Sequence, residues 1–262
     1  MKPTQMVNEF IFSIKQNKLK SFVYFILRLA VVMVGIRQLF LGNYNSVFMC
    51  VLTLVLFLVP VYVNKYFNIE LPNTLEIIII LFIFSAEILG EVNEYYLTVP
   101  HWDTVLHTIN GFIMGGIGFA LIDILNRSEK VSMKLSPFFV ALTAFCFSMT
   151  TGIIWEFFEF GMDMFFKTDM QKDTVVTMIS SVMFNPEGAN VAVKVPIQEV
   201  IVNGEVWNYG GYIDIGLIDT MKDLIVNFVG AVVFSVVGLL YTSGRSKFAE
   251  QFIPKHVEPE VE

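Results

Sequence analysis

The sequence predicts an all-α polytopic membrane protein with six transmembrane helices and both termini in the cytoplasm. Hydrophobic residues make up 55% of the 262 residues and charged residues only 16%, against the roughly 25% usual in soluble domains. The mean hydropathy is +0.65. Six windows also have the run of about 20 mainly apolar residues that a helix needs to cross a bilayer. Together these observations exclude an ordinary water-soluble fold.

The six windows are residues 22–41, 46–63, 74–92, 103–125, 137–160 and 220–241. The first is not expected to be a cleaved signal peptide, because it contains Arg28 and Arg37 and lacks a small-residue cleavage site. Before it, apolar residues recur at helical spacing beside lysines such as Lys15. We therefore expect residues 1–21 to form an amphipathic segment on the anionic cytoplasmic surface.

The distribution of basic residues sets the predicted orientation. With the N-terminus inside, eleven Lys and Arg residues fall on cytoplasmic segments and four on outer segments, as the positive-inside rule expects. The predicted order is a cytoplasmic segment at 1–21, transmembrane helices 1–5 within 22–163, an extracytoplasmic cap at 164–218, transmembrane helix 6 at 219–242 and a cytoplasmic tail at 243–262. The charged tail after Gly244 is expected to be disordered.

The extracytoplasmic cap is too long to be a simple connection between two helices. Residues Asp169 to Phe184 are expected to form an amphipathic interfacial helix. Further along, Asn203-Gly204 lies between two β-rich runs within residues 199–207. Because Asn-Gly supplies the positive φ of a type I′ turn, this stretch predicts a β-hairpin.

Polar residues recur at one helical spacing on four of the predicted helices. Steps of three, four or seven residues return to the same face of a helix, so each group forms a stripe. In the predicted topology, helices 3 and 5 end in their stripes and helices 4 and 6 begin with theirs, which puts all four in the outer third of the membrane. The stripes are Glu87, Glu91 and Glu94; Asp103, His107 and Asn110; Glu156, Glu159 and Asp163; and Asp219, Asp223 and Asn227.

Four acidic stripes at one depth need compensation, because each charge below the headgroups costs about 2.5 to 3.5 kcal/mol. Carboxylate and amide oxygens suit Mg²⁺, Ca²⁺ or Mn²⁺, whereas a single histidine does not suit a common zinc site. A bound cation, shared protons or a water-filled pocket would provide this compensation, and we expect an outward-facing pocket that is suited to a divalent cation. The candidate metal ligands, which are also the candidate catalytic residues, are Asp103, His107, Glu156, Glu159, Asp219 and Asp223. Further pocket candidates are Arg37, Glu87, Glu91, Asn110, Asp163 and Asn227.

Simpler interpretations exist for several of these residues. Asp103 and Asp219 also suit the start of an inward-running helix, where the dipole favours an anion. Glu91 and Asp163 are placed where they reach headgroup water. A lone histidine such as His107 is more often a hydrogen-bonded packing residue, and a lone arginine such as Arg37 extends its charged head to the interface.

Three motifs occur in order along the chain. They are Trp102-Asp103-x3-His107-x3-Gly111-Phe112, Trp155-Glu156-x2-Glu159-Phe160 and Asp219-x3-Asp223-x3-Asn227-x2-Gly230-Ala231. Over residues 75–241 the sequence thereby resembles the YjdF-type family of bacterial inner-membrane proteins and, more distantly, the VanZ-like family. The resemblance implies a multi-pass location in the bacterial cytoplasmic membrane and, for the VanZ-like branch, a link to glycopeptide-antibiotic resistance.

The sequence departs from the VanZ-like pattern at two places. VanZ-like proteins carry Glu-x-x-Gln where this chain has Glu156-x-x-Glu159, and they have an Arg before the final Asp that is missing here between helices 5 and 6. The resemblance therefore implies no particular reaction. Zinc-protease, nucleophile-elbow and Walker motifs are also absent from the sequence.

Three classes of function remain open on the sequence alone. The first is a membrane enzyme or lipid-binding factor whose metal pocket engages an anionic lipid or cell-wall precursor. The second is a proton- or cation-coupled transporter, although transporters place their ion sites near the midplane. The third is a structural or immunity-type membrane protein with solvated acids. The expected partners are membrane lipids rather than nucleic acid, and the sequence does not indicate an oligomeric state.

Overall fold

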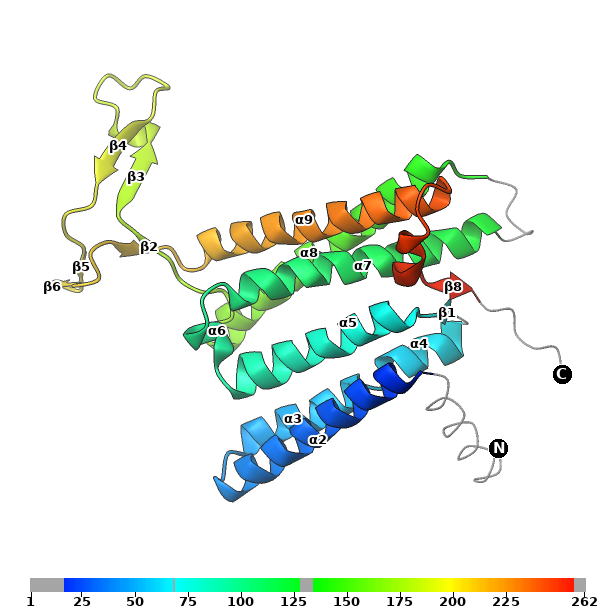
Figure 1. Cartoon of the computed structure of the whole chain (residues 1–262). Helices are drawn as coiled ribbons and strands as arrows, with labels where there is room; N and C mark the ends of the chain where they lie inside the picture. The colour runs from blue at the N-terminus through cyan, green and yellow to red at the C-terminus, as the bar shows by residue number, and fades with distance from the viewer. Residues whose placement is uncertain (1–16, 68, 128–133, 257–262) are drawn as a thin grey trace. The chain divides into compact units, whose positions relative to one another are not determined.

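The computed structural model describes residues 17–67, 69–127 and 134–256, and it is mainly helical (Figure 1). The chain divides into two units. Unit 1 comprises residues 1–152 and 226–262, and unit 2 comprises residues 153–225. The predicted amphipathic segment at 1–21 lies largely outside the described residues, since only its end belongs to the first described helix.

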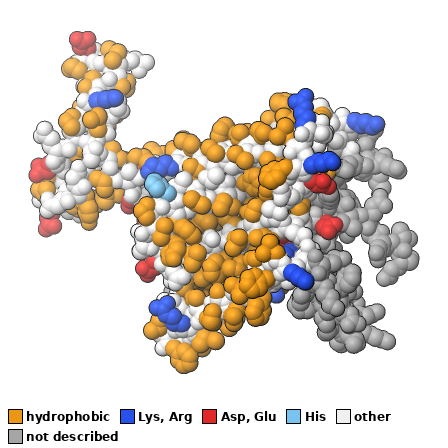
Figure 2. All heavy atoms as spheres, in the orientation of Figure 1, with side chains coloured by type: hydrophobic (Ala, Val, Ile, Leu, Met, Phe, Trp, Pro, Cys, Tyr) orange, Lys and Arg blue, Asp and Glu red, His pale blue; other side chains and the backbone are white. Residues whose placement is uncertain are grey.

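Within the described residues, five helical segments are long and apolar enough to cross a membrane. They are Lys18–Phe40, Tyr44–Asn64, Trp102–Asp123, Pro137–Phe166 and Leu217–Thr242. Leu29, Met33 and Ile36 on the first of these are among many exposed large apolar side chains, and Figure 2 shows hydrophobic side chains covering much of the visible helical surface. Such apolar exposure suits a lipid environment and supports a multi-pass membrane protein.

Helices α2, α3 and α5 of unit 1 share one core. α2 (Lys18–Phe40) packs beside α3 (Tyr44–Leu56), and α4 (Val59–Phe67) follows a break within the second predicted window (Figure 1). Val31 of α2 and Cys50 of α3 are buried in a cluster with Ile80 of α5.

The third predicted window forms two consecutive helical segments instead of one regular helix. α5 (Asn73–Phe84) continues into the π-helix η1 (Ser85–Val92), where the Asn93 N–H donates to the Ile88 carbonyl. Glu94 lies beyond this helix with a φ of 58°, so the predicted stripe of three glutamates is wrong at its last member. Each segment alone is shorter than the about 20 residues that a span requires.

The other long helices are α7 (Trp102–Arg127), α8 (Pro137–Phe166) and α9 (Leu217–Thr242), with the short α6 (Tyr95–Thr98) before α7. In unit 1, α7 and α9 run parallel, because Gly111 lies against Asn227 and Gly115 lies against Phe234 further along both. α8 runs in the opposite sense, because Ser148 bonds to Gly111 whereas Val140 packs with Phe119 later in α7.

A polar contact joins α2 to the first turn of α5. Lys20 Nζ lies 2.9 Å from Glu76 Oε2, and the Tyr24 hydroxyl donates to Glu76 Oε1 over 2.9 Å. The Arg28 guanidinium lies over the Tyr24 ring, 5.2 Å from its centroid. Because Glu76 is buried, these donors compensate the desolvation of its carboxylate.

The segment after α9 is ordered, so the prediction of a disordered tail is wrong up to residue 256. It forms the 3-10 helix η3 (Phe248–Phe252) and the strand β8 (Lys255–His256), which pairs antiparallel with β1 (Ile69–Glu70). Apolar side chains within the charged tail account for this order, because burial of such groups favours a docked conformation.

Unit 2 contains the C-terminal half of α8, the first turns of α9 and the segment that connects the two helices. β2 (Val175–Val176) pairs with β7 (Tyr212–Ile213), and β3 (Met178–Ser181) pairs with β4 (Val193–Pro196). The 3-10 turn η2 (Val182–Phe184) follows β3. β5 (Ile201–Val202) pairs with β6 (Glu205–Val206) across Asn203 and Gly204, both of which have positive φ.

The predicted helix from Asp169 to Phe184 is wrong, because this stretch contains β2, β3 and η2. Its β-branched residues find hydrogen-bonding partners in segments that follow much later in the chain. The spacing of apolar residues within one segment does not reveal partners that are distant in the sequence. The apolar spacing of this stretch therefore predicted a helix where the chain forms strands.

Candidate functional site

Asp103 and His107 form a pair at the start of α7. His107 Nε2 lies 3.4 Å from Asp103 Oδ1, and the histidine is 8% exposed. The start of the helix is fixed by Trp102, whose indole N–H donates to the Ser85 carbonyl of η1 over 3.3 Å. Asp103 therefore combines two favourable positions: it lies in the first turn of a helix, where the dipole favours an anion, and it faces His107.

Asn227 lies at the crossing of α7, α8 and α9 within unit 1. It is 1% exposed. Asn110 Nδ2 donates to Asn227 Oδ1, and Asn227 Nδ2 donates to the Ser148 carbonyl, both over 3.5 Å. Ser148 Oγ in turn donates to the Gly111 carbonyl over 2.7 Å. Asn110 and Asn227, both predicted pocket residues, are thus brought together and connect three helices.

Glycines make this crossing possible. A Cβ at Gly111 would lie 2.2 Å from the Asn227 carbonyl oxygen, and a Cβ at Gly230 would lie 2.0 Å from the Thr108 carbonyl oxygen. On α8, a Cβ at Gly152 would lie 2.6 Å from Asn227 Nδ2. Small residues allow membrane helices to approach closely. We refer to Gly111, Gly152 and Asn227 together as the helix crossing.

In unit 2, α8 carries two buried glutamates. Glu156 is 4% exposed and Glu159 is 8% exposed. The indole N–H of Trp155 donates to Glu159 Oε1 over 2.8 Å. This hydrogen bond fixes one carboxyl oxygen of Glu159. Trp155 precedes Glu159 by four residues, and this helical spacing is the signal in the sequence that could have indicated the contact. Asp223 on α9 is also buried, at 3% exposure.

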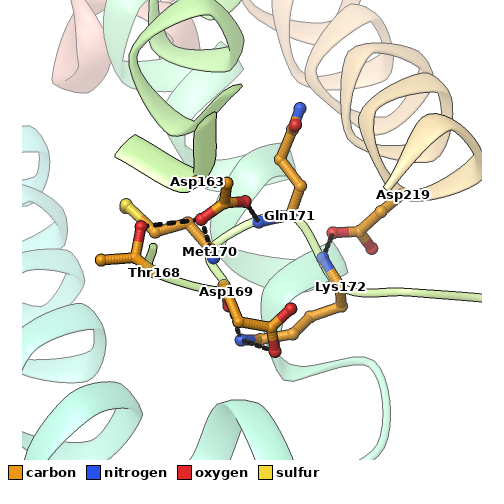
Figure 3. Close-up of polar contacts among 7 residues, drawn as sticks. All are labelled: Asp163, Thr168, Asp169, Met170, Gln171, Lys172 and Asp219. Carbon is orange, nitrogen blue, oxygen red and sulfur yellow. Dashed lines mark hydrogen bonds and ion pairs between the residues drawn. The ribbon is translucent and has the colours of Figure 1, made fainter. Parts of the chain in front are cut away.

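Asp163 and Asp219 contact the same loop after α8 (Figure 3). Asp163 Oδ1 accepts from the Met170 N–H over 2.7 Å, and its Oδ2 accepts from the Gln171 N–H over 2.8 Å. Asp219 Oδ2 accepts from the Lys172 N–H over 2.6 Å. These bonds satisfy backbone donors of residues 168–172, so both aspartates stabilise the loop in addition to any part in a metal site.

Asp214 performs a similar task before α9 and was missed by the sequence analysis. Its Oδ1 accepts from the Thr174 N–H over 2.8 Å and its Oδ2 from the Ile218 N–H over 2.9 Å. Burial raises the pKa of Asp214, but the N–H donors of Thr174, Ile218 and Gly216 outweigh burial and lower the pKa below its ordinary value. The signal available in the sequence was an Asp shortly before an apolar helix.

The pKa of the neighbouring Asp173 moves the other way. Burial raises it first, and the negative charges of Asp169, Asp214 and Asp163 raise it further, while Lys172 opposes them. Gln171 and Thr220 also bond to each other across this region. With the pairing of β2 and β7, these contacts join the end of α8 to the start of α9.

The remaining pocket candidates lie elsewhere in unit 1. Glu87 and Glu91 are on the π-helix η1, with Glu87 partly buried and Glu91 exposed. Arg37 is in the last turn of α2 and is exposed. The described contacts bring none of these three to Asp103 or His107.

The apolar helices, their exposed hydrophobic faces and the buried polar positions define a multi-pass α-helical membrane protein. The chain belongs to the family described as Predicted membrane protein (DUF2238), whose model matches residues 19–244. No curated protein and no solved structure matches the chain.

Proposed function

We propose that the chain is a bacterial cell-envelope membrane protein whose outward-facing acidic pocket binds a divalent cation and engages an anionic lipid or cell-wall precursor. The proposed ligands are Asp103, His107, Glu156, Glu159, Asp219 and Asp223. In this proposal the chain crosses the membrane six times, and α5 and η1 together form the third span. We also propose that the protein is related to the YjdF-type proteins and, more distantly, to the VanZ-like proteins.

The observation that carries the proposal is the position of three ligands relative to the helix crossing. His107 precedes Gly111 by four residues, and Asp223 precedes Asn227 by four residues, on two parallel helices. On the antiparallel helix α8, Glu156 follows Gly152 by four residues. A step of four returns to nearly the same helix face one turn away. On this basis we propose that His107, Glu156 and Asp223 contribute to one site.

The bonds around two of the proposed ligands suit a metal site. Asp103 faces one ring nitrogen of His107, and Trp155 holds one oxygen of Glu159. Partners of this kind orient ligands in known metal sites. Carboxylates with one imidazole are donors for a hard or borderline divalent ion such as Mg²⁺, Ca²⁺ or Mn²⁺. A bound ion of this kind would offset the acidic charge and attract a phosphate-bearing headgroup.

One observation favours the transporter as a second candidate. Glu87 and Glu91 lie on the π-helix η1, and π-helical turns occur frequently at functional sites. A carboxylate on an irregular membrane helix suits an exchangeable proton or cation. The metal proposal does not use these two residues.

Thermal unfolding of the purified full chain in detergent tests the metal proposal. Mg²⁺, Ca²⁺ or Mn²⁺ at one hundred times its Kd should stabilise the fold by about 2.7 kcal/mol, and chelator should reverse the gain. Asp223→Asn and Glu156→Gln should reduce this response while the protein remains folded. Glu205→Gln, at an exposed strand position, should respond like the wild type.

The transporter makes the opposite prediction. If metal and chelator leave the wild-type unfolding curve unchanged, and a proton gradient drives solute movement in liposomes in a Glu87-dependent manner, the metal proposal is abandoned.

The outward orientation of the pocket is tested separately. A cysteine that replaces Asn203 should react with an impermeant maleimide on intact cells, whereas a cysteine that replaces Lys130 should not. Reversed labelling removes the outward pocket.

A further inference from the structure

The C-terminal segment after α9 contacts two separate parts of unit 1. β8 pairs with β1, which directly precedes α5, with Ile69 opposite His256 and Glu70 opposite Lys255. η3 also lies against α5. On the other side, the ring of Phe252 packs edge-on against Phe112 of α7, with 5.6 Å between centroids.

Burial, rather than regular hydrogen bonding, holds this segment in place. Ile253 is 0% exposed and belongs to the cluster of Phe119, Val140 and Phe234 from α7, α8 and α9. Ala249 is 2% exposed. In contrast, the paired strands have two residues each and η3 has five, and such short elements are not stable by themselves.

The connection to α9 suits a segment that docks as a unit. The N–H of Gly244 donates to the Tyr241 carbonyl and the N–H of Arg245 donates to the Leu240 carbonyl, which is the pattern of a Schellman cap. Gly244 has a φ of 67°, which glycine adopts without strain. The chain thereby leaves α9 sharply and returns along the bundle.

We propose that residues Phe248–Phe252 and 253–256 form a detachable strap that fastens the β1–α5 segment to α7, α8 and α9. In the docked state the strap seals the apolar surface around Phe112 and Phe234. Its release uncovers this apolar surface without unfolding the helices, because the helices keep their own backbone hydrogen bonds and α5 still packs directly against α7. The proposal does not depend on the metal site.

Hydrogen exchange of the full chain in detergent, resolved by peptide, tests the strap. In the wild type, amides of residues 248–256 should exchange at least tenfold faster than those of central α7. Ile253→Asp should raise exchange in the strap and at residues 69–72 a further tenfold, because it places a charge in an apolar cluster. Phe248→Asp is the matched control, since Phe248 is 69% exposed in the same segment. Exchange in α3 should not change in either variant.

A cross-link tests the strap even if Ile253→Asp does not fold. In a chain with Cys50→Ala and Cys146→Ala, the pair Glu70→Cys and Lys255→Cys is at opposed positions of the two strands, within disulfide reach. Oxidation should slow exchange of the strap at least tenfold relative to the reduced form. Equal exchange in both forms, or wild-type strap amides as slow as central α7, would show a fixed part of the core and overturn the proposal.

Discussion

Asn227 of α9 lies so close to Gly152 of α8 that a methyl group at position 152 would come within 2.6 Å of the Asn227 Nδ2 atom. Asn227 is 1% exposed and its Nδ2 donates to the Ser148 carbonyl, so rotation of the side chain away from this contact would break a buried hydrogen bond. Gly111 meets the same asparagine from α7. The spacing of three helices therefore depends on the absence of two side chains.

The first prediction follows from this contact. Gly152→Ala should destabilise the protein by about 1 to 3 kcal/mol, the usual range for overpacking a close contact. Gly161→Ala, on the same helix, is the control: nothing lies within 4 Å of a Cβ there, so it should be neutral or up to about 1 kcal/mol more stable. Unfolding in detergent measures both, and equal behaviour of the two variants would contradict the proposed packing.

The second prediction concerns the contact between α2 and α5. Glu76→Gln should destabilise the protein by roughly 1 to 3 kcal/mol, because it leaves a partly buried Lys20 ammonium without its counter-charge. Tyr24→Phe should have a smaller effect, since the salt bridge remains. Glu70→Gln, at an exposed acid, provides the control.

A double-mutant cycle separates this contact from general damage. If Lys20 and Glu76 interact, the variant Lys20→Met with Glu76→Gln should lose less stability than the two single variants combined. Additive losses would show that the 2.9 Å contact contributes nothing beyond the separate residues.

The third prediction concerns pH. The pKa of Asp214 is lowered in the folded chain, although burial opposes this, because backbone N–H groups of Thr174, Ile218 and Gly216 favour the carboxylate. The stabilisation is therefore complete above the ordinary pKa of about 3.9 and is lost as the pH falls through the lower folded value. Asp214→Ala should cost about 0.5 to 2 kcal/mol at neutral pH.

Protection factors of the Thr174 and Ile218 amides, measured in steps downward from pH 7, follow this loss locally. In the wild type the protection should persist down to the ordinary pKa of a free aspartate and be lost below it, whereas Asp214→Ala should lack protection throughout. Asp173→Asn is an informative contrast, because the pKa of Asp173 is raised, so its neutralisation should not weaken the fold at pH 7. Protection that is independent of pH in the wild type would contradict the assigned bonds.

The positions of the long helices could be predicted well from the sequence. The windows at 103–125, 137–160 and 220–241 correspond to α7, α8 and α9 with differences of a few residues. Long apolar runs are local properties of the chain, so they need no knowledge of partners. The Asn203-Gly204 turn is also a local property, because it depends on two adjacent residues, and it could therefore be predicted from the sequence.

The candidate site was only partly predictable. Helical spacing indicated that Asp103 and His107 share a face, and the structure pairs them. Spacing did not indicate that Asp163 and Asp219 bind backbone N–H groups of one loop. A carboxylate with free oxygens and a carboxylate already bonded to the backbone look identical in a sequence.

The sequence by itself determined that this protein resides in a membrane and where the long helices α7, α8 and α9 lie, to within a few residues. These features follow from composition and from the fixed period of the α-helix. Only the tertiary structure decided that Asn227 sits between Gly111 and Gly152, and that Ile253 completes the core around Phe234. Contacts of this kind join residues far apart in the chain, and burial depends on the surfaces that meet, which no local pattern contains.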